Sequence, residues 1–217
     1  MIRKRIVVLI SGGGSNLQAI LDACADQSVA GQVVAVVSNR PGVMGLQRAV
    51  THGADAITLD HTQFASRTLF DQALQHRIDS YQPDLVVLAG FMRILTADLV
   101  SHYLGRMVNI HPSLLPKYPG LHTHERALAA GDRQAGATVH LVTPELDGGP
   151  LLAQAHVAID DQDTALSLAD KVLVAEHQLY PLVLSWLCGN QLIFVDGIPH
   201  FDGETLLFPK QIDNTGH

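Results

Sequence analysis

The sequence predicts an α/β fold, a three-layer sandwich in which a mostly parallel but mixed central sheet carries helices on both faces. Two observations lead to this prediction. Continuous apolar runs such as IVVLI and LVVLA alternate with amphipathic segments over the first half of the chain, and such runs are typical of strands buried on both faces. After residue 132, two strand-like runs follow one another across a Gly-Gly-Pro loop, so they are expected to pair antiparallel.

The expected elements follow from the local pattern of apolar residues. Apolar runs predict strands over residues 5–10, 33–37, 54–59, 85–89, 107–110, 137–142 and 151–159. Apolar spacings of three and four residues predict helices from residue 15, over 44–52, 66–81 and 164–187, and a short helix from residue 96.

The last helix and the tail complete the expected fold. Five helix residues fall at steps of three and four and form an expected stripe: Leu166, Ala169, Leu173, Glu176 and Tyr180. Asp-Gly pairs at 196–197 and 202–203 predict a hairpin meander. With 217 residues and no linker, the chain is expected to form a single domain over residues 1–217, in which 189–217 is a C-terminal hairpin and tail.

Composition excludes several classes of protein. Lys and Arg number 14 and Asp and Glu 21, and a net charge of −7 disfavours nucleic-acid binding. Two cysteines are too few for a disulfide scaffold, and no His-Glu-x-x-His pattern supports zinc. No apolar run approaches the ~20 residues of a membrane span. We therefore expect a cytoplasmic protein, a monomer or homodimer, that takes small-molecule substrates and no metal, membrane or nucleic acid.

The segment Ser11–Asn16 (SGGGSN) links the first strand to the first helix and is a candidate phosphate site. A Gly-rich turn lets main-chain N–H groups approach an anion, and Ser15 or Asn16 can cap the helix or donate to a phosphate. Leu17 stands where a dinucleotide fingerprint needs glycine, and no P-loop lysine follows. A small phosphorylated metabolite fits better, and a tight turn without a ligand is the alternative.

The polar residues after the fifth strand form a candidate reaction centre. Alternation along the strand places Asn109 and His111 on the same side of the sheet, at the carboxyl edge where α/β proteins bind ligands. An amide and an imidazole can stabilise an oxyanion and move a proton, as acyl transfer requires. The alternative is a buried histidine beside a turn asparagine.

Four more charged side chains are candidates. Asp147 sits in a loop shaped by glycines and prolines, where it would orient a nearby histidine or serve only as a turn residue. Glu176 interrupts the apolar helix stripe, so it needs a partner, a ligand such as a sugar hydroxyl, or a place at the wet edge of the stripe. Arg67 and Arg93 lie near the expected ligand edge and would hold a carboxylate or remain on the surface.

Taken together, these segments resemble the folate-dependent formyltransferases over about residues 5–187. The resemblance rests on residues 9–19 (LISGGGSNLQA), 88–95 (LAGFMRIL), 109–116 (NIHPSLLP) and 145–150 (ELDGGP), with 117–124 (KYPGLHTH) in support. It implies one formyltransferase catalytic domain that moves a formyl group from 10-formyltetrahydrofolate, its cosubstrate, to the amine of 5'-phosphoribosylglycinamide in purine biosynthesis. Direct attack through a tetrahedral intermediate is expected.

The resemblance also implies roles for individual residues. The implied catalytic residues are Asn109, His111 and Asp147. The implied ribonucleotide contacts are Gly14, Ser15, Asn16 and Glu176. The implied folate contacts are Arg67, Met92, Arg93, Ile94, Leu95, Asn109, Thr143, Pro144, Glu145, Leu146 and Asp147.

Three alternatives use parts of the same pattern. A formyltetrahydrofolate hydrolase would use the same three catalytic residues with water as acceptor, but such enzymes carry a preceding regulatory domain. A methionyl-tRNA formyltransferase would be longer and would carry a basic C-terminal domain. A non-catalytic nucleotide sensor would need the Gly-rich loop alone.

Overall fold

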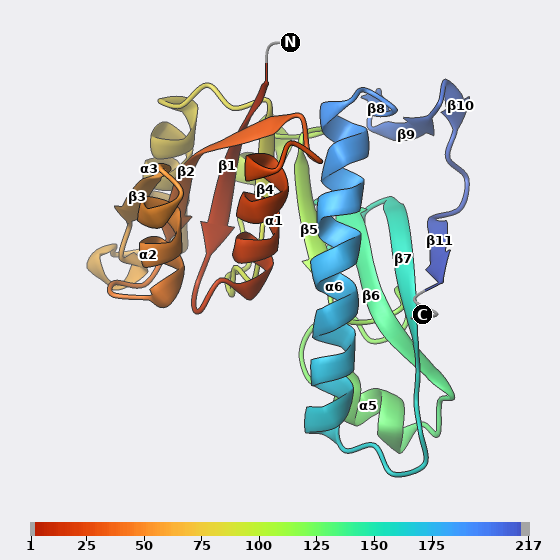
Figure 1. Cartoon of the computed structure of the whole chain (residues 1–217). Coiled ribbons are helices and arrows are strands. Elements are labelled where there is room, and N and C mark those ends of the chain that lie inside the picture. Colours follow the sequence, from red (N-terminus) through yellow and green to blue (C-terminus); the bar gives the residue numbers. More distant parts are fainter. Residues whose placement is uncertain (1–2, 214–217) are drawn as a thin grey trace.

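An eight-stranded central sheet lies between helices in the computed structural model, which describes residues 3–213 (Figure 1). The strand order in this sheet is β11-β7-β6-β5-β4-β1-β2-β3. Its strands are β1 Lys4–Ile10, β2 Gly31–Ser38, β3 Asp55–Thr58, β4 Leu85–Leu88, β5 Met107–His111, β6 Gln134–Leu141, β7 Leu151–Ala158 and β11 Lys210–Asp213. The helices are α1 Ser15–Ala25, α2 Met44–Thr51, α3 Arg67–Asp79, α4 Ala97–His102, α5 Thr123–Ala129 and α6 Ala165–Cys188, with a 3-10 turn η1 at His61–Gln63.

The mixed, mostly parallel sheet confirms the predicted fold class. β1 to β5 pair in parallel, whereas β6 pairs antiparallel with both β5 and β7. The expected antiparallel pairing of the two strands after residue 132 is thus confirmed. The central strands are buried along their length, as their continuous apolar runs predict.

Helices cover the two faces of the sheet unequally. Buried side chains of α1, α2 and α6 pack on one face of the sheet in a single core cluster. The second cluster joins α3 and α4 to the other face of β1, β2 and β4 and to the start of β5. Figure 1 shows the long α6 running beside α1 across β5 and β6. Because α3 and α4 cover only one half of their face, β6 and β7 need another cover there.

The loop after β5 forms part of that cover. Thr138 of β6 and Gln154 of β7 are buried polar residues, and both bind the main chain of Leu115. The Leu115 N–H donates to Thr138 Oγ1 at 3.1 Å, and Gln154 Nε2 donates to the Leu115 carbonyl at 2.7 Å. These bonds fix the loop that leaves His111, because buried polar groups without partners are costly.

Helix α6 fixes the carboxyl ends of two central strands. Its Tyr180 is fully buried, and the hydroxyl lies 2.9 Å from the Leu88 carbonyl of β4 and 3.1 Å from the Val108 carbonyl of β5. A buried tyrosine hydroxyl needs such partners. Strands β4 and β5, which lead into the candidate site, are therefore held together by one side chain from helix α6.

Two details of the helices differ from the sequence-based predictions. The segment before β6 contains helix α5, which the Pro- and Gly-containing sequence did not suggest. The expected stripe of α6 was placed on the wrong residues in part: Leu166 is 74% exposed, and the core contacts come from Leu168, Val172 and Ala175 instead. Glu176 and Tyr180 do lie on the buried face.

The tail adds two kinds of strand. The Asp-Gly pairs at 196–197 and 202–203 lie at positive φ between β8 Leu192–Val195, β9 Ile198–Phe201 and β10 Glu204–Thr205, an antiparallel sheet like the predicted meander. The fourth strand, β11, instead joins the main sheet in parallel beside β7, which was not expected. Residues 214–217 of the predicted tail lie outside the described residues.

Candidate active site

Two cavities lie side by side at the carboxyl edge of the sheet. They share the segment 88–95 after β4 as a wall. Ala89, Gly90 and Met92 line one cavity, whereas Leu88, Phe91 and residues 93–95 line the other. Ligands in the two cavities would therefore be separated by a single stretch of chain.

The first cavity is formed by the Gly-rich loop between β1 and α1. Its wall consists of residues 11–16 together with Arg40 and the β4 loop. Gly14 has φ 72, and a Cβ added there would lie 3.0 Å from Gly45 Cα. Glycine is favoured at this position because a side chain would strain the left-handed conformation and crowd Gly45.

Helix α1 begins without a side-chain cap. The N-cap is Gly14, and neither Ser15 nor Asn16 caps the helix, so the predicted capping role was wrong. Within residues 3–213, the N–H groups of Gly12 to Asn16 have no protein acceptor. Unpaired N–H groups at a helix N-terminus form an anion-binding surface, because the helix dipole adds to their own partial charges.

Asn16 and Glu176 lie side by side at the base of this loop. Both side chains are buried, and Asn16 Nδ2 donates to Glu176 Oε2. Burial raises the pKa of the Glu176 carboxyl to about 7, and the Asn16 hydrogen bond opposes that rise. The Asn16 amide oxygen, Oδ1, is buried without a partner among the described residues. The Asn16–Glu176 pair and the N–H groups of the loop therefore lie close together. They offer more hydrogen-bonding groups than a phosphate alone would use.

The second cavity collects the residues expected to carry chemistry. Asn109, the whole segment 143–147 and Arg93 to Leu95 line it, with apolar walls from Leu88, Phe91 and Val142. Asp147 stands at its inner end, where the side chain is only 9% exposed.

The loop that carries Asp147 has a backbone that only certain residues allow. Asp147 itself has φ 52, and a Cβ on Gly149 would lie 1.8 Å from the Leu141 carbonyl oxygen. Residue 149 is a glycine and has no side chain, so the loop can return tightly onto β6. This close return brings Asp147 back toward the end of β5.

Asp147 is placed between two histidines. Its Oδ2 lies 3.5 Å from His111 Nδ1 and accepts the Gly120 N–H at 2.8 Å, and its Oδ1 lies 3.7 Å from His140 Nε2. The structure thus brings His111 and Asp147 together, as the sequence predicted, and adds His140. No role for His140 was predicted from the sequence, although it is a titratable side chain in a mostly apolar strand.

Asn109 is oriented by His140. The two residues face each other in the β5–β6 register, and Asn109 Nδ2 lies 3.1 Å from His140 Nε2. His140 Nδ1 lies 3.0 Å from the Leu141 carbonyl, which can only accept, so this nitrogen carries the proton. Burial lowers the pKa of His140 and favours the neutral ring, whose Nε2 accepts from the Asn109 amide. The Asn109 amide group is therefore fixed with its nitrogen toward His140.

His111 is held behind Asp147 rather than in the cavity wall. Its Nε2 lies 2.9 Å from the Tyr118 carbonyl, and its Nδ1 faces Asp147. Both ring nitrogens thus face oxygen acceptors, which fix the orientation of the ring. The position of this ring depends on how firmly Tyr118 is held.

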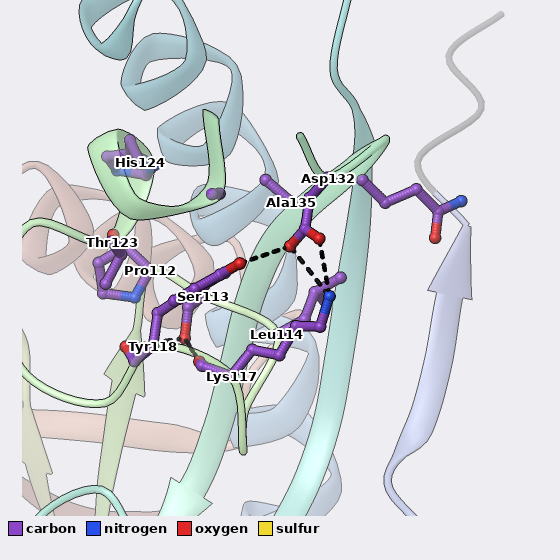
Figure 2. Close-up of a pocket in the computed structure, with 11 residues that line it drawn as sticks. Pro112, Ser113, Leu114, Lys117, Tyr118, Thr123, His124, Asp132 and Ala135 are labelled. Atoms are coloured by element: carbon purple, nitrogen blue, oxygen red, sulfur yellow. Dashed lines mark hydrogen bonds and ion pairs between the residues drawn. The ribbon is translucent and has the colours of Figure 1, made fainter. Parts of the chain in front are cut away.

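Figure 2 shows what holds Tyr118. A small cavity of about 240 Å³ lies under the loop, and Asp132 is paired there with Lys117 Nζ at 2.8 Å and with the Tyr118 hydroxyl at 2.9 Å. Ser113 Oγ donates to the Lys117 carbonyl at 2.6 Å. These contacts fix the main chain on both sides of the carbonyl that meets His111.

The structure separates three residues that the sequence analysis grouped as folate contacts. Arg93 lines the second cavity, and its guanidinium lies 5.0 Å above the Phe70 ring. Met92 lines the Gly-loop cavity instead, and its N–H donates to Ser11 Oγ at 2.8 Å. Arg67 is exposed at the start of α3 and belongs to the wall of neither cavity.

This arrangement can support acyl transfer. An amide N–H donor, a carboxylate and an imidazole converge at one end of a cavity with apolar walls, where donors stabilise a developing oxyanion strongly. The neighbouring cavity offers main-chain N–H groups for an anion. Within residues 3–213, no group of three or more His, Cys, Asp or Glu side chains is placed to hold a metal ion. No described helix is both long and apolar enough to cross a membrane.

Comparison with known proteins places the chain in one family. Residues 4–184 match the family model described as Formyl transferase. The chain is 52% identical to "Phosphoribosylglycinamide formyltransferase" of Escherichia coli (strain K12), over 93% of this chain and 95% of that protein. A solved structure of phosphoribosylglycinamide formyltransferase from Coxiella burnetii in complex with CHES has a TM-score of 0.90 and 48% identity, over 96% of this chain and 99% of that one. Glycinamide ribonucleotide transformylase 1 from Symbiobacterium toebii matches with a TM-score of 0.88 and 42% identity, over 92% and 94% of the two chains.

Proposed function

The chain belongs to the formyl transferase family, and from that premise we propose how its site transfers a formyl group from 10-formyltetrahydrofolate to the amine of 5'-phosphoribosylglycinamide in purine biosynthesis. One observation carries the proposal. An anion cradle and a cavity with an acyl-transfer constellation lie on either side of the segment 88–95, so a phosphorylated acceptor and a formyl donor can meet across it.

The ribonucleotide occupies the Gly-loop cavity in this proposal. Its phosphate accepts from the free N–H groups of Gly14, Ser15 and Asn16 at the start of α1. The ribose hydroxyls lie beside Glu176, whose carboxylate is buried next to Asn16 and able to accept from them. The glycine amine then extends past the β4 loop toward Asn109.

The folate occupies the second cavity. The ring system packs against the apolar walls and the main chain of residues 93–95 and 143–147, which supply the polar groups that fix its orientation. Met92 contributes to the wall that separates the two ligands. For Arg67, exposed at the start of α3, a role in holding the folate remains a prediction.

The reaction itself follows from the positions of three side chains. The amine nitrogen attacks the formyl carbon, the C=O becomes an oxyanion, and the bond from that carbon to N10 of the folate then breaks. The Asn109 N–H and the His111 ring donate to the oxyanion, for which His111 exchanges one of its protein acceptors. Asp147 orients the ring and relays the proton that the amine loses to N10.

The competing hydrolase would use the same groups with water as the acceptor. The discriminating experiment measures tetrahydrofolate release from 10-formyltetrahydrofolate with and without 5'-phosphoribosylglycinamide. Release that depends on the ribonucleotide, with a formylated ribonucleotide as product, supports the transferase. Equal release without it would support the hydrolase, and no release with either acceptor would support the non-catalytic sensor.

The remaining expectations concern the setting of the enzyme. A cytoplasmic location, catalysis without a metal ion, and a monomeric or homodimeric state are predictions from the sequence. A single catalytic domain over residues 1–217 is likewise a prediction, and the function of the tail after residue 188 is unassigned.

A further inference from the structure

The carbonyl groups of the Gly-rich loop are bound on the side away from the cavity. The Gly12 carbonyl accepts from the Gly45 N–H at 3.3 Å, and the Gly14 carbonyl accepts from the Gln18 N–H at 2.9 Å. Between them, the Gly13 carbonyl accepts from Arg48 Nε at 2.9 Å. Each of the three carbonyls in a row therefore has its own donor.

Fixing these carbonyls also fixes the N–H groups that face the cavity. In a trans peptide unit, the N–H of one residue points opposite to the carbonyl of the residue before it. A carbonyl held away from the cavity thus turns the next N–H toward it, and the Gly13 carbonyl controls the N–H of Gly14. Successive N–H groups arranged in this way form an anion-binding concavity.

Of the three donors, Arg48 alone is a side chain. It lies one helical turn after Gly45 on α2, and it is half-buried against the loop. A second guanidinium nitrogen, Nη1, donates to Gln18 Oε1 at 2.8 Å, so the same group ties the loop to α1. Arg48 is not part of the cavity wall, whereas Arg40 is.

We propose that Arg48 is a positioning residue for phosphate recognition: its guanidinium holds the Gly13 carbonyl and thereby aims the Gly14 N–H at the phosphate of the acceptor. This inference rests on the proposed function. It assigns Arg48 no contact with substrate and no part in the chemistry. Replacing Arg48 should therefore weaken binding of the phosphorylated acceptor and leave binding of the formyl donor unchanged.

The test compares two acceptors in the full-length protein. Formyl transfer is measured for the wild type and Arg48→Met with 5'-phosphoribosylglycinamide and with the same acceptor lacking its phosphate. We expect Arg48→Met to raise KM for the phosphorylated acceptor roughly 10- to 100-fold, because a charged hydrogen bond and the loop geometry are lost. The kcat and the KM for the folate should stay within about twofold of wild type, and so should kcat/KM for the acceptor without phosphate.

A matched control separates this role from general support of the fold. Arg5 makes the same kind of bond, from Nε to the Tyr81 carbonyl at 2.8 Å, but it lies at the opposite end of β1. Arg5→Met should leave both acceptors unaffected. A second variant, Arg48→Lys, retains one donor that can reach Gly13 but not Gln18 at the same time, so its KM should fall between wild type and Arg48→Met.

Each result decides the inference. An equal loss of kcat/KM with both acceptors would show that Arg48 has only a structural role. Wild-type constants in Arg48→Met would show that the guanidinium does not contribute to phosphate recognition. Should Arg48→Met fail to fold, Arg48→Leu takes its place, because leucine also lacks the donor to the Gly13 carbonyl, and wild-type constants in that variant would overturn the inference. A wild-type protein that transfers formyl to neither acceptor would instead refute the proposed function, so the two failures are distinguishable.

Discussion

The two cavities at the carboxyl edge of the sheet share the segment 88–95 as a wall but are otherwise made from different parts of the chain. The Gly-loop cavity presents main-chain N–H groups from one continuous segment of six residues. The other presents side chains that come from β5, β6 and the loop after β6, which are brought together only by the fold. Binding of the phosphate thus depends on backbone shape, and the chemistry depends on side-chain identity.

This difference determines what each region tolerates. In the Gly-rich loop, a substitution is harmful when it changes φ or blocks a close approach, because the side chains themselves contribute little. Around Asn109, an isosteric substitution that keeps the shape can still remove the function. The following predictions use that contrast, in order of expected effect.

The largest effect is expected for Asp147→Asn. The amide has the same shape and can still accept the Gly120 N–H, but it cannot carry the charge that His111 faces. We expect kcat to fall roughly 10²- to 10⁴-fold, the range that general acid–base groups contribute, with the melting temperature little changed. Steady-state kinetics and thermal unfolding measure both.

A matched control for this variant is Asp163→Asn. The Asp163 side chain is also nearly buried, at 6% exposure against 9% for Asp147, and it pairs with Lys171 at 2.7 Å at the start of α6. It should lose stability and keep its turnover. Wild-type kcat in Asp147→Asn at neutral pH would remove Asp147 from the mechanism.

Asn109→Ala should have the next largest effect on kcat. It deletes one oxyanion donor and leaves His140 Nε2 without its partner. Loss of one such donor lowers kcat roughly 10²- to 10³-fold in other enzymes, and we expect the same here with KM for the ribonucleotide little changed. If KM rises while kcat holds, Asn109 is a binding residue and the division between the two cavities is less sharp.

Gly14→Val should impair binding and spare chemistry. A left-handed conformation costs a residue with a Cβ about 1–2 kcal/mol, and the Cβ would press on Gly45, so KM for the ribonucleotide should rise roughly 10- to 100-fold. The control is Gly53→Val, because Gly53 has φ 75 but open space around it. Equal KM increases in both variants would mean that backbone strain alone, and not the loop, is responsible.

The smallest effect is a pH dependence of stability. Burial raises the pKa of Glu176 to about 7, above its ordinary value of 4.5, so ionisation is harder in the folded state than in the unfolded chain. The wild type therefore loses stability as pH rises from the unfolded value through about 7, whereas neutral Glu176→Gln does not. We expect the advantage of the variant in melting temperature to grow by roughly 5 °C between pH 5 and pH 8. A difference in melting temperature that stays constant across this range would contradict the conclusion that ionised Glu176 is buried.

The sequence anticipated the backbone region better than the side-chain region, for a physical reason. The Gly-rich turn between the first strand and the first helix is a local property that neighbouring residues reveal. The pairing of Asn109 with His140 depends on the β5–β6 register, which no local pattern encodes. Likewise, the placement of Met92 in the Gly-loop wall and the contact of Arg48 with Gly13 depend on how loops meet in space.

His111 illustrates the limit most clearly. Its spacing from Asn109 correctly indicated one side of the sheet, and its nearness to Asp147 was expected. The sequence could not indicate that the ring also binds the Tyr118 carbonyl, because that contact depends on a loop anchored by Asp132 on a distant turn.

The most direct test of the account is calorimetric titration of both ligands into Gly14→Val and Asp147→Asn side by side. The account predicts that Gly14→Val binds the ribonucleotide far more weakly than wild type but binds the folate normally. It predicts that Asp147→Asn binds both ligands with near wild-type affinity although it turns over slowly. The account would be contradicted if Gly14→Val bound the ribonucleotide as wild type does, or if Asp147→Asn lost affinity for both ligands in proportion to its loss of turnover.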